Sequence, residues 1–259
     1  MKKALLGIII CLIGLTANSQ NSTLVPEVNP IAIQKTFALW QDYQDHHIML
    51  SLDFVALDDQ AQNISKKQFL TTLTTGEYFP LKMLSDKNQI TTYQLYKVQP
   101  TSDTSIKAYM ASLAFNELQN YTMEGQQFPA FNYVDLQGNP ITNQTMLGNI
   151  VVIKCWYIHC AACIKEFSSV NALVSKYQKR SDVQFISLAE DTPELLKAFL
   201  IKKPLSYSVV PNMKLYMNES LHLNAFPTHF ILDKQGKILK VLLNFESLEV
   251  ALKEVLEKN

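Results

Sequence analysis

This sequence lacks three features that would narrow its class at once. It has no net charge, with 23 basic and 23 acidic residues, so nothing suggests a nucleic-acid-binding surface. It has only 4 cysteines, too few for a small scaffold held together by disulfides. It also has no internal repeat and no low-complexity tract. Its 259 residues and ordinary hydrophobic content of 47% fit one large or two modest globular domains.

The first residues resemble an export signal rather than part of a fold. Lys2 and Lys3 precede an apolar stretch from Ala4 to Leu15, which is too short to cross a bilayer comfortably. Small residues follow, so we predict a secretory signal peptide over residues 1–19. An uncleaved membrane anchor is the alternative. No later segment has the pattern of a transmembrane helix.

Residues 20–121 predict a smaller α+β domain without a recognisable chemical motif. A short amphipathic helix is expected around Ile31 to Trp40, and the alternation from Ile48 to Ala56 predicts a half-buried strand. Ser65 and Gln68 have the spacing of a capping box, so a helix should follow and stop at Gly76. A strand over Ile90 to Val98 and a helix from Ile106 to Leu118 complete the prediction.

Residues 122–259 predict an α/β domain with a central sheet. The expected strands and helices alternate, which implies right-handed crossovers, and a late hairpin should add antiparallel edge strands. They comprise a first hairpin over Phe131 to Ile141, strands at Ile150–Cys155 and Val183–Leu188, helices up to Lys176 and from Pro193, the late hairpin from Phe230 to Leu243, and a last helix over Ser247–Glu257.

The pair Cys160 and Cys163 lies between a strand-like run and a helix-like pattern. Thiols three residues apart at a helix start can form a short-loop disulfide, and the helix dipole favours a thiolate there. A stabilised thiolate is a good participant in disulfide exchange. In an oxidising compartment such a pair is more plausibly catalytic than structural.

The order of motifs around this pair resembles the exported TlpA/ResA-like thiol–disulfide oxidoreductases, which have a thioredoxin fold. The matching elements are Gly125, Pro129 and Phe131, then Trp156-Tyr157-Ile158-His159-Cys160-Ala161-Ala162-Cys163, then Phe226-Pro227-Thr228-His229-Phe230-Ile231-Leu232-Asp233. The resemblance covers the second half of the chain. It implies a central mixed sheet flanked by helices, and no cofactor beyond the Cys160–Cys163 couple itself.

The resemblance also implies roles for individual residues. Cys160 would be the nucleophile and Cys163 the buried resolving thiol. Pro227 would have a cis peptide bond and leave the backbone of Phe226 free to hold an extended client, beside Trp156. Glu166 would lie near Cys163 as a partly buried carboxyl with a raised pKa, relaying a proton.

Three residues depart from the family pattern and should tune the redox potential. His159 stands where the family usually has Trp, and a protonated imidazole would favour the thiolate. Ala161 and Ala162 stand where a proline is common. His229 follows Thr228 on an expected buried strand, where a histidine is more often a core residue than a catalytic one.

Other uses of these cysteines are weaker. With Cys155, the pair has the spacing of a plant-type [2Fe–2S] site. That site needs a fourth cysteine, and the mature chain would have none, because Cys11 lies in the predicted signal peptide. Zinc binding through His159, a Sco-like copper chaperone and a peroxiredoxin-like peroxidase fit the spacing less well, so no metal is expected and Cys155 should be a buried small residue.

We therefore predict an exported, periplasmic or cell-envelope thiol–disulfide oxidoreductase. The resemblance favours a reductase that receives electrons from a membrane thiol–disulfide carrier and acts on exported proteins with disulfides, apocytochrome c among the options. A non-catalytic thioredoxin-like binding module is the alternative from a different class.

Overall fold

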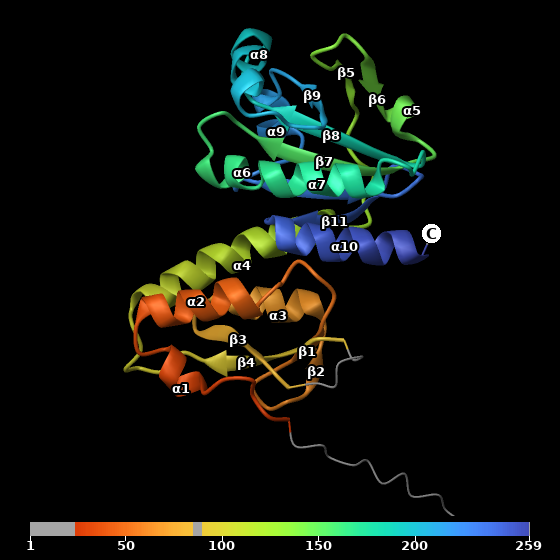
Figure 1. Ribbon diagram of the computed structural model, residues 1–259. Coiled ribbons are helices and arrows are strands. Elements are labelled where there is room, and N and C mark those ends of the chain that lie inside the picture. Colours follow the sequence, from red (N-terminus) through yellow and green to blue (C-terminus); the bar gives the residue numbers. More distant parts are fainter. Residues whose placement is uncertain (1–23, 85–89, 259) are drawn as a thin grey trace, which may run out of the picture.

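The computed structural model describes residues 24–84 and 90–258, so the predicted signal peptide lies outside the described residues. Two domains lie one above the other, with α4 passing between them (Figure 1). Among the described residues, no helix is both long and apolar enough to cross a bilayer.

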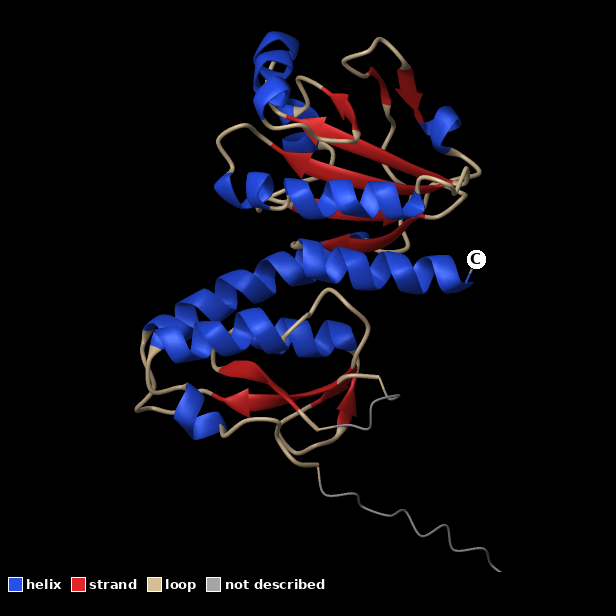
Figure 2. Ribbon diagram, viewed as in Figure 1, coloured by secondary structure: helices blue, strands red, loops and turns tan. Residues whose placement is uncertain are grey.

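The first domain is a four-stranded sheet with helices over one face. Its strand order is β2-β1-β4-β3, and β1 runs parallel to β4 while the other pairs are antiparallel. Figure 2 shows α2, α3 and α4 on the same side of the strands. The elements are α1 (Pro30–Ile33), α2 (Phe37–His47), β1 (Val55–Leu57), β2 (Asn63–Ile64), α3 (Lys66–Leu73), β3 (Tyr78–Lys82), β4 (Thr92–Lys97) and α4 (Ser105–Met123).

Local signals explain several of these elements. Ser65 and Gln68 form the predicted capping box at the start of α3. Shortly after the helix, Gly76 adopts a φ of +70°, which is incompatible with a continued helix and which glycine adopts readily. On β4, Tyr93 and Leu95 are buried while their neighbours are not, as one covered face requires. Buried side chains from α2, α3, α4 and the sheet form one continuous core.

Some predictions for the first domain were wrong. The alternation from Ile48 to Ala56 is mostly a turn, and only Val55–Leu57 forms a strand. Ile48 and Leu50 are buried because this turn packs against the domain core. Their alternation therefore does not come from a β-strand. The short helix predicted around Ile31 to Trp40 consists of two helices, α1 and α2. The domain boundary predicted at residue 122 falls in the last turn of α4.

The second domain has a five-stranded mixed sheet covered on both faces. The order is β11-β10-β7-β8-β9, with β7, β8 and β9 parallel and β10 antiparallel to both neighbours. Its elements are β5 (Asn132–Val134), β6 (Pro140–Thr142), α5 (Asn143–Met146), β7 (Ile150–Trp156), α6 (Ala161–Lys165), α7 (Phe167–Tyr177), β8 (Val183–Ala189), α8 (Pro193–Lys202), β9 (Ser208–Val210), α9 (Lys214–Glu219), β10 (Thr228–Leu232), β11 (Ile238–Leu242) and α10 (Phe245–Lys258).

The thioredoxin-like prediction for this domain is confirmed in its main elements. β7 is buried along its whole length because its alternate side chains face two different cores, one with α7 and α10 and one with α9. β10 of the late hairpin is an inner strand and only β11 lies at the edge, which corrects the prediction of two edge strands. Sequence patterns also missed β9 and α9, both short.

Candidate active site

Cys160 and Cys163 form a disulfide at the beginning of α6. Cys160 is the N-cap residue, and its Sγ accepts a hydrogen bond from the backbone N–H of Cys163 at 3.1 Å. Cys160 is 5% exposed and Cys163 is fully buried. The first sulfur is therefore the one that a partner can reach, and the N–H of Cys163 is placed to stabilise negative charge on it.

The predicted cis bond precedes Pro227, directly before β10. The ring of Phe226 makes an edge contact with Tyr157, with ring centroids 5.5 Å apart, so the proline loop meets the segment that leads into the cysteines. No other described residue forms a hydrogen bond with the backbone of Phe226. Its N–H and carbonyl thus have no partner within the described residues, and their use by an extended peptide stays a prediction.

Trp156 is not placed to touch a client. It is fully buried, stacks edge-on against Phe167, and donates a hydrogen bond from its indole N–H to Ser187 Oγ at 2.9 Å. The predicted substrate-binding role is therefore corrected to a packing role beneath the cysteines. His159, Ala161 and Ala162 are all exposed around the cysteine pair, where they contact solvent rather than the core.

Glu166 separates α6 from α7 and points away from solvent into a buried polar cluster. Its Oε2 lies 2.6 Å from Lys154 Nζ and 3.0 Å from His229 Nε2, and its Oε1 accepts the backbone N–H of Phe245 at 2.8 Å. Lys154 and His229 are fully buried and stand opposite each other on β7 and β10. Three donors thus hold one carboxylate below the cysteine helix.

The electrostatics of this cluster reverse one prediction. Burial alone would raise the pKa of Glu166, but the hydrogen bond from His229 and the charge and hydrogen bond of Lys154 outweigh it, so the pKa is lowered. Burial and the neighbouring lysine lower the pKa of His229. The state we assign is a Lys154–Glu166 ion pair with a neutral His229 donating from Nε2; its Nδ1 has no partner.

Sequence reasoning missed Lys154 as a site residue. The available signal was a charged residue within the apolar run Ile150–Trp156, since a lysine is almost never fully buried without a partner. The histidine prediction was half right. His229 is a core residue on a buried strand, but it is bonded to the functional carboxylate rather than merely satisfied.

The remaining cysteine takes no part in this arrangement. Cys155 is free and fully buried, and burial raises the pKa of its thiol. Within the described ranges, no group of three or more histidine, cysteine or acidic side chains is placed to hold a metal ion.

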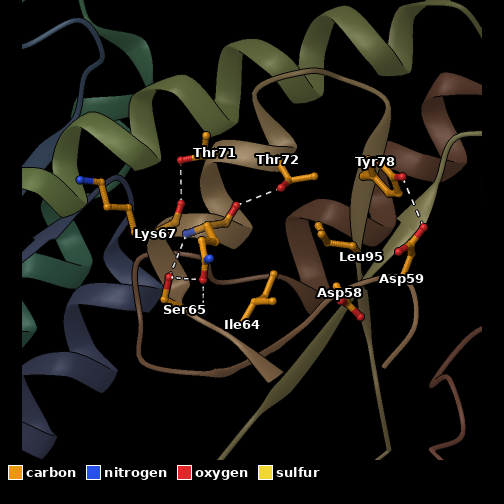
Figure 3. Close-up of a pocket in the computed structure, with 10 residues that line it drawn as sticks. Asp58, Asp59, Ile64, Ser65, Lys67, Thr71, Thr72, Tyr78 and Leu95 are labelled. Atoms are coloured by element: carbon orange, nitrogen blue, oxygen red, sulfur yellow. Dashed lines mark hydrogen bonds between the residues drawn. The ribbon is translucent and has the colours of Figure 1, made fainter. Parts of the chain in front are cut away.

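A second hollow, in the first domain, offers no comparable chemistry (Figure 3). It has a volume of about 520 Å³ and lies between α3, the segment before it and the sheet. Three of its polar side chains are already engaged: Thr71 and Thr72 donate to carbonyls of their own helix, and the hydroxyl of Tyr78 donates to Asp59 at 3.3 Å. The cysteine pair is thus the stronger candidate.

Comparison with known proteins agrees with this assignment. Residues 124–241 match the AhpC/TSA family. Thiol-disulfide oxidoreductase ResA of Bacillus cereus is 28% identical over 126 residues, which is 48% of this chain and 72% of that protein. ResA of Bacillus thuringiensis subsp. konkukian is 29% identical over 135 residues, 52% of this chain and 77% of that protein.

Among solved structures, a thiol-disulfide oxidoreductase from Bacteroides fragilis aligns with a TM-score of 0.46 and 19% identity, over 50% of this chain and 99% of that one. The order of motifs, the sheet, the disulfide and the ResA relatives all concern the same half of the molecule. This second domain is thus TlpA/ResA-like: it is similar to thiol–disulfide oxidoreductases of the thioredoxin superfamily, and this similarity supports an oxidoreductase activity.

Proposed function

We propose that this protein is an exported disulfide reductase that acts on extracytoplasmic proteins through Cys160 and Cys163. The observation that carries the proposal is the Cys160 sulfur at the start of α6, which accepts a hydrogen bond from the N–H of Cys163. Phe226, whose backbone has no partner among the described residues, packs against the same cluster. A membrane dithiol carrier would return electrons to the pair, and clients would be exported proteins, with apocytochrome c as one option.

The exchange proceeds in two balanced steps. The Cys160 thiolate attacks one sulfur of a client disulfide, forming a mixed disulfide and releasing a client thiolate that takes up a proton. Cys163 then loses its proton and attacks Cys160, which releases the second client thiol and restores the Cys160–Cys163 disulfide. Two electrons pass to the client, and a carrier dithiol is oxidised when the pair is reduced again.

Buried Cys163 needs a proton acceptor for the second step, and Glu166 follows it by three residues. Because its pKa is lowered, Glu166 is ionised at neutral pH and is available as a base, with Lys154 and His229 fixing its position. Glu166→Gln should flatten the pH dependence of the reduction rate. Glu249→Gln, on the exposed face of α10, is the matched control. A profile identical to wild type would contradict this role.

Insulin reduction with dithiothreitol as electron donor tests the proposed activity. Cys160→Ser should abolish turnover because the nucleophile is gone, whereas Cys155→Ala should retain it because that thiol is buried and outside the site. No thiol-dependent turnover by the wild-type chain would favour the binding-module alternative. The direction of electron flow follows from the reduction potential of the pair: a value near about −270 mV indicates a reductase, and one near about −120 mV an oxidant.

A further inference from the structure

A groove of about 680 Å³ lies between the two domains, directly beside the cysteine helix. One wall comes from α6, through Ala162 and Lys165, and the opposite wall from α2 and α4 of the first domain. Figure 1 shows α6 on the side of the second domain that is turned toward α4. Anything seated in the groove would therefore lie next to Ala162, one of the two residues between the cysteines.

Two residues that line the groove have buried hydrogen-bonding atoms without partners among the described residues. Gln44 is 4% exposed and its Oε1 has no hydrogen-bond partner; Ser247 is fully buried and its Oγ has none. Both residues line the groove, from α2 and from α10. A buried polar atom without a partner destabilises a protein, so an incoming donor would relieve that loss.

Carboxyls outnumber cations around this space. Asp45, Glu117 and Glu246 line it from α2, α4 and α10, against Lys165 from α6, with His46 beside Asp45. No hydrogen bond joins the Glu117 carboxyl to any other described residue, although that residue is 7% exposed. The groove thus presents acceptors and negative charge, and the ligand it suits is a cation with several N–H donors, which is the chemistry of a guanidinium group.

We propose that this groove binds an arginine side chain of an extended polypeptide, and that the first domain thereby selects clients with a basic residue near their disulfide. The selection of clients rests on the proposed function, whereas the binding of an arginine side chain does not. Glu117 and Gln44 would receive the guanidinium, while the chain that carries it passes over Ala162 toward Cys160. The first domain then contributes one wall of a client site rather than a separate activity.

Glu117 makes this binding pH-dependent. Burial raises its pKa to about 7, against the lowering effect of Lys66, while Glu124 raises it further. A bound guanidinium favours the ionised form, so affinity should increase between about pH 6 and about pH 8. The other titratable groups that face Glu117 across the groove are Asp45, His46, Lys165 and Glu246.

Binding can be measured without any thiol chemistry. The probe is a fluorescein-labelled peptide of arginine, glycine and serine without cysteine, titrated with the oxidised full chain and followed by fluorescence anisotropy. Replacing arginine with citrulline, its uncharged analogue, should weaken binding about tenfold or more, and so should Glu117→Gln. Glu219→Gln, on exposed α9, removes a carboxyl of the same size away from the groove and should leave affinity unchanged.

Two results would overturn the proposal: equal affinity for the arginine and citrulline peptides, or equal affinity of the wild type and Glu117→Gln with the same pH profile. Reduction of hydroxyethyl disulfide by the wild-type chain tests the proposed function separately, because that small neutral substrate cannot fill the groove. If the wild type reduces this substrate but does not prefer arginine, only the proposal of an arginine-binding groove is contradicted. If it binds arginine selectively but does not reduce the substrate, only the proposed reductase function is contradicted.

Discussion

The two sheets of this chain bury their strands differently, and the difference shows where chemistry can be placed. β4 in the first domain alternates between buried and partly exposed residues, whereas β7 in the second is buried at every position. Helices cover one face of the first sheet and both faces of the second. The cysteine helix follows the strand that is held from both sides, so its position is fixed by two cores rather than one.

The same contrast applies to buried charge. In the second domain, Lys154 and Glu166 form an ion pair with His229 as a third member. In the first domain, the amine of Lys66 donates to the backbone carbonyls of Ser51 and Leu52, at 3.2 and 2.8 Å, and leaves the Glu117 carboxyl without a hydrogen bond. The carboxylate of the first cluster is bound by donors of its own domain, whereas the carboxyl of the second has no donor among the described residues.

Replacing buried Lys154 and half-buried Lys66 with methionine should give the largest difference. Lys154→Met leaves an uncompensated carboxylate beneath the cysteine helix and should lower the free energy of unfolding by about 3–5 kcal/mol. Lys66→Met leaves two carbonyls without a donor, and we expect a loss of about 1–3 kcal/mol. Urea denaturation followed by circular dichroism measures both. Equal losses would show that the ion pair adds nothing beyond its hydrogen bonds.

Glu117 and Glu166 should respond to pH with opposite signs. The folded-state pKa of Glu117 is raised to about 7, so its contribution is present below the unfolded value near 4.5 and is lost as pH rises through 7. Glu117→Gln should therefore stabilise the protein above neutral pH, by up to about 3 kcal/mol. The lowered pKa of Glu166 means its contribution is present above 4.5 and is lost in acid.

Urea midpoints of wild type, Glu117→Gln and Glu166→Gln across this pH range provide the check. Glu166→Gln should be less stable than wild type at neutral pH and converge with it in acid. If both variants shift stability in the same direction at neutral pH, the contrast between the open and the closed cluster fails.

The chain has two tryptophans, one in each domain, and both are fully buried. Trp156 donates to Ser187, whereas the indole N–H of Trp40 has no partner. Trp156→Phe should cost about 1–3 kcal/mol more than Trp40→Phe, because only the former leaves a buried hydroxyl unpaired. Fluorescence of the remaining tryptophan then reports unfolding of one domain at a time. Equal losses in the free energy of unfolding would show that the hydrogen bond from Trp156 to Ser187 does not contribute to stability.

His159→Ala should have the smallest effect. The side chain is exposed and makes no hydrogen bond or ion pair with the described residues. An exposed charge interaction is worth about 0–1 kcal/mol, which corresponds to a decrease of no more than about 20 mV in the reduction potential of the cysteine pair. Equilibration with glutathione buffers measures it. A larger shift would mean that the histidine contacts the thiolate in the reduced protein.

The sequence was most informative where a local rule fixes the structure. The capping box of Ser65, the stop at Gly76 and the cysteine pair before a helix each depend on neighbours along the chain, and each was predicted. The cis bond before Pro227 also agrees, although that prediction came from resemblance to a family rather than from spacing.

Predictions failed where partners come from distant segments. The alternation after Ile48 followed the packing of a turn on its own domain. The raised pKa expected for Glu166 assumed burial alone, and the lowering depends on Lys154 and His229, which reach it only because β7 and β10 pair in one register. Likewise, the groove between the domains is lined by residues of both domains, so the pattern of a single segment could not predict it.

The segment between the domains has a consequence for shortening the chain. Directly after α4, Gly125 donates to the carbonyl of Ile238 at 2.7 Å, and the N–H of Ile238 donates to Gln126 at 2.9 Å, so the linker covers the outer edge of β11. An uncovered edge strand invites pairing with another molecule. A protein that begins at Phe131 would keep Cys155, Cys160 and Cys163 and yet expose that edge, so it should self-associate, whereas one that retains Gly125 and Gln126 should not.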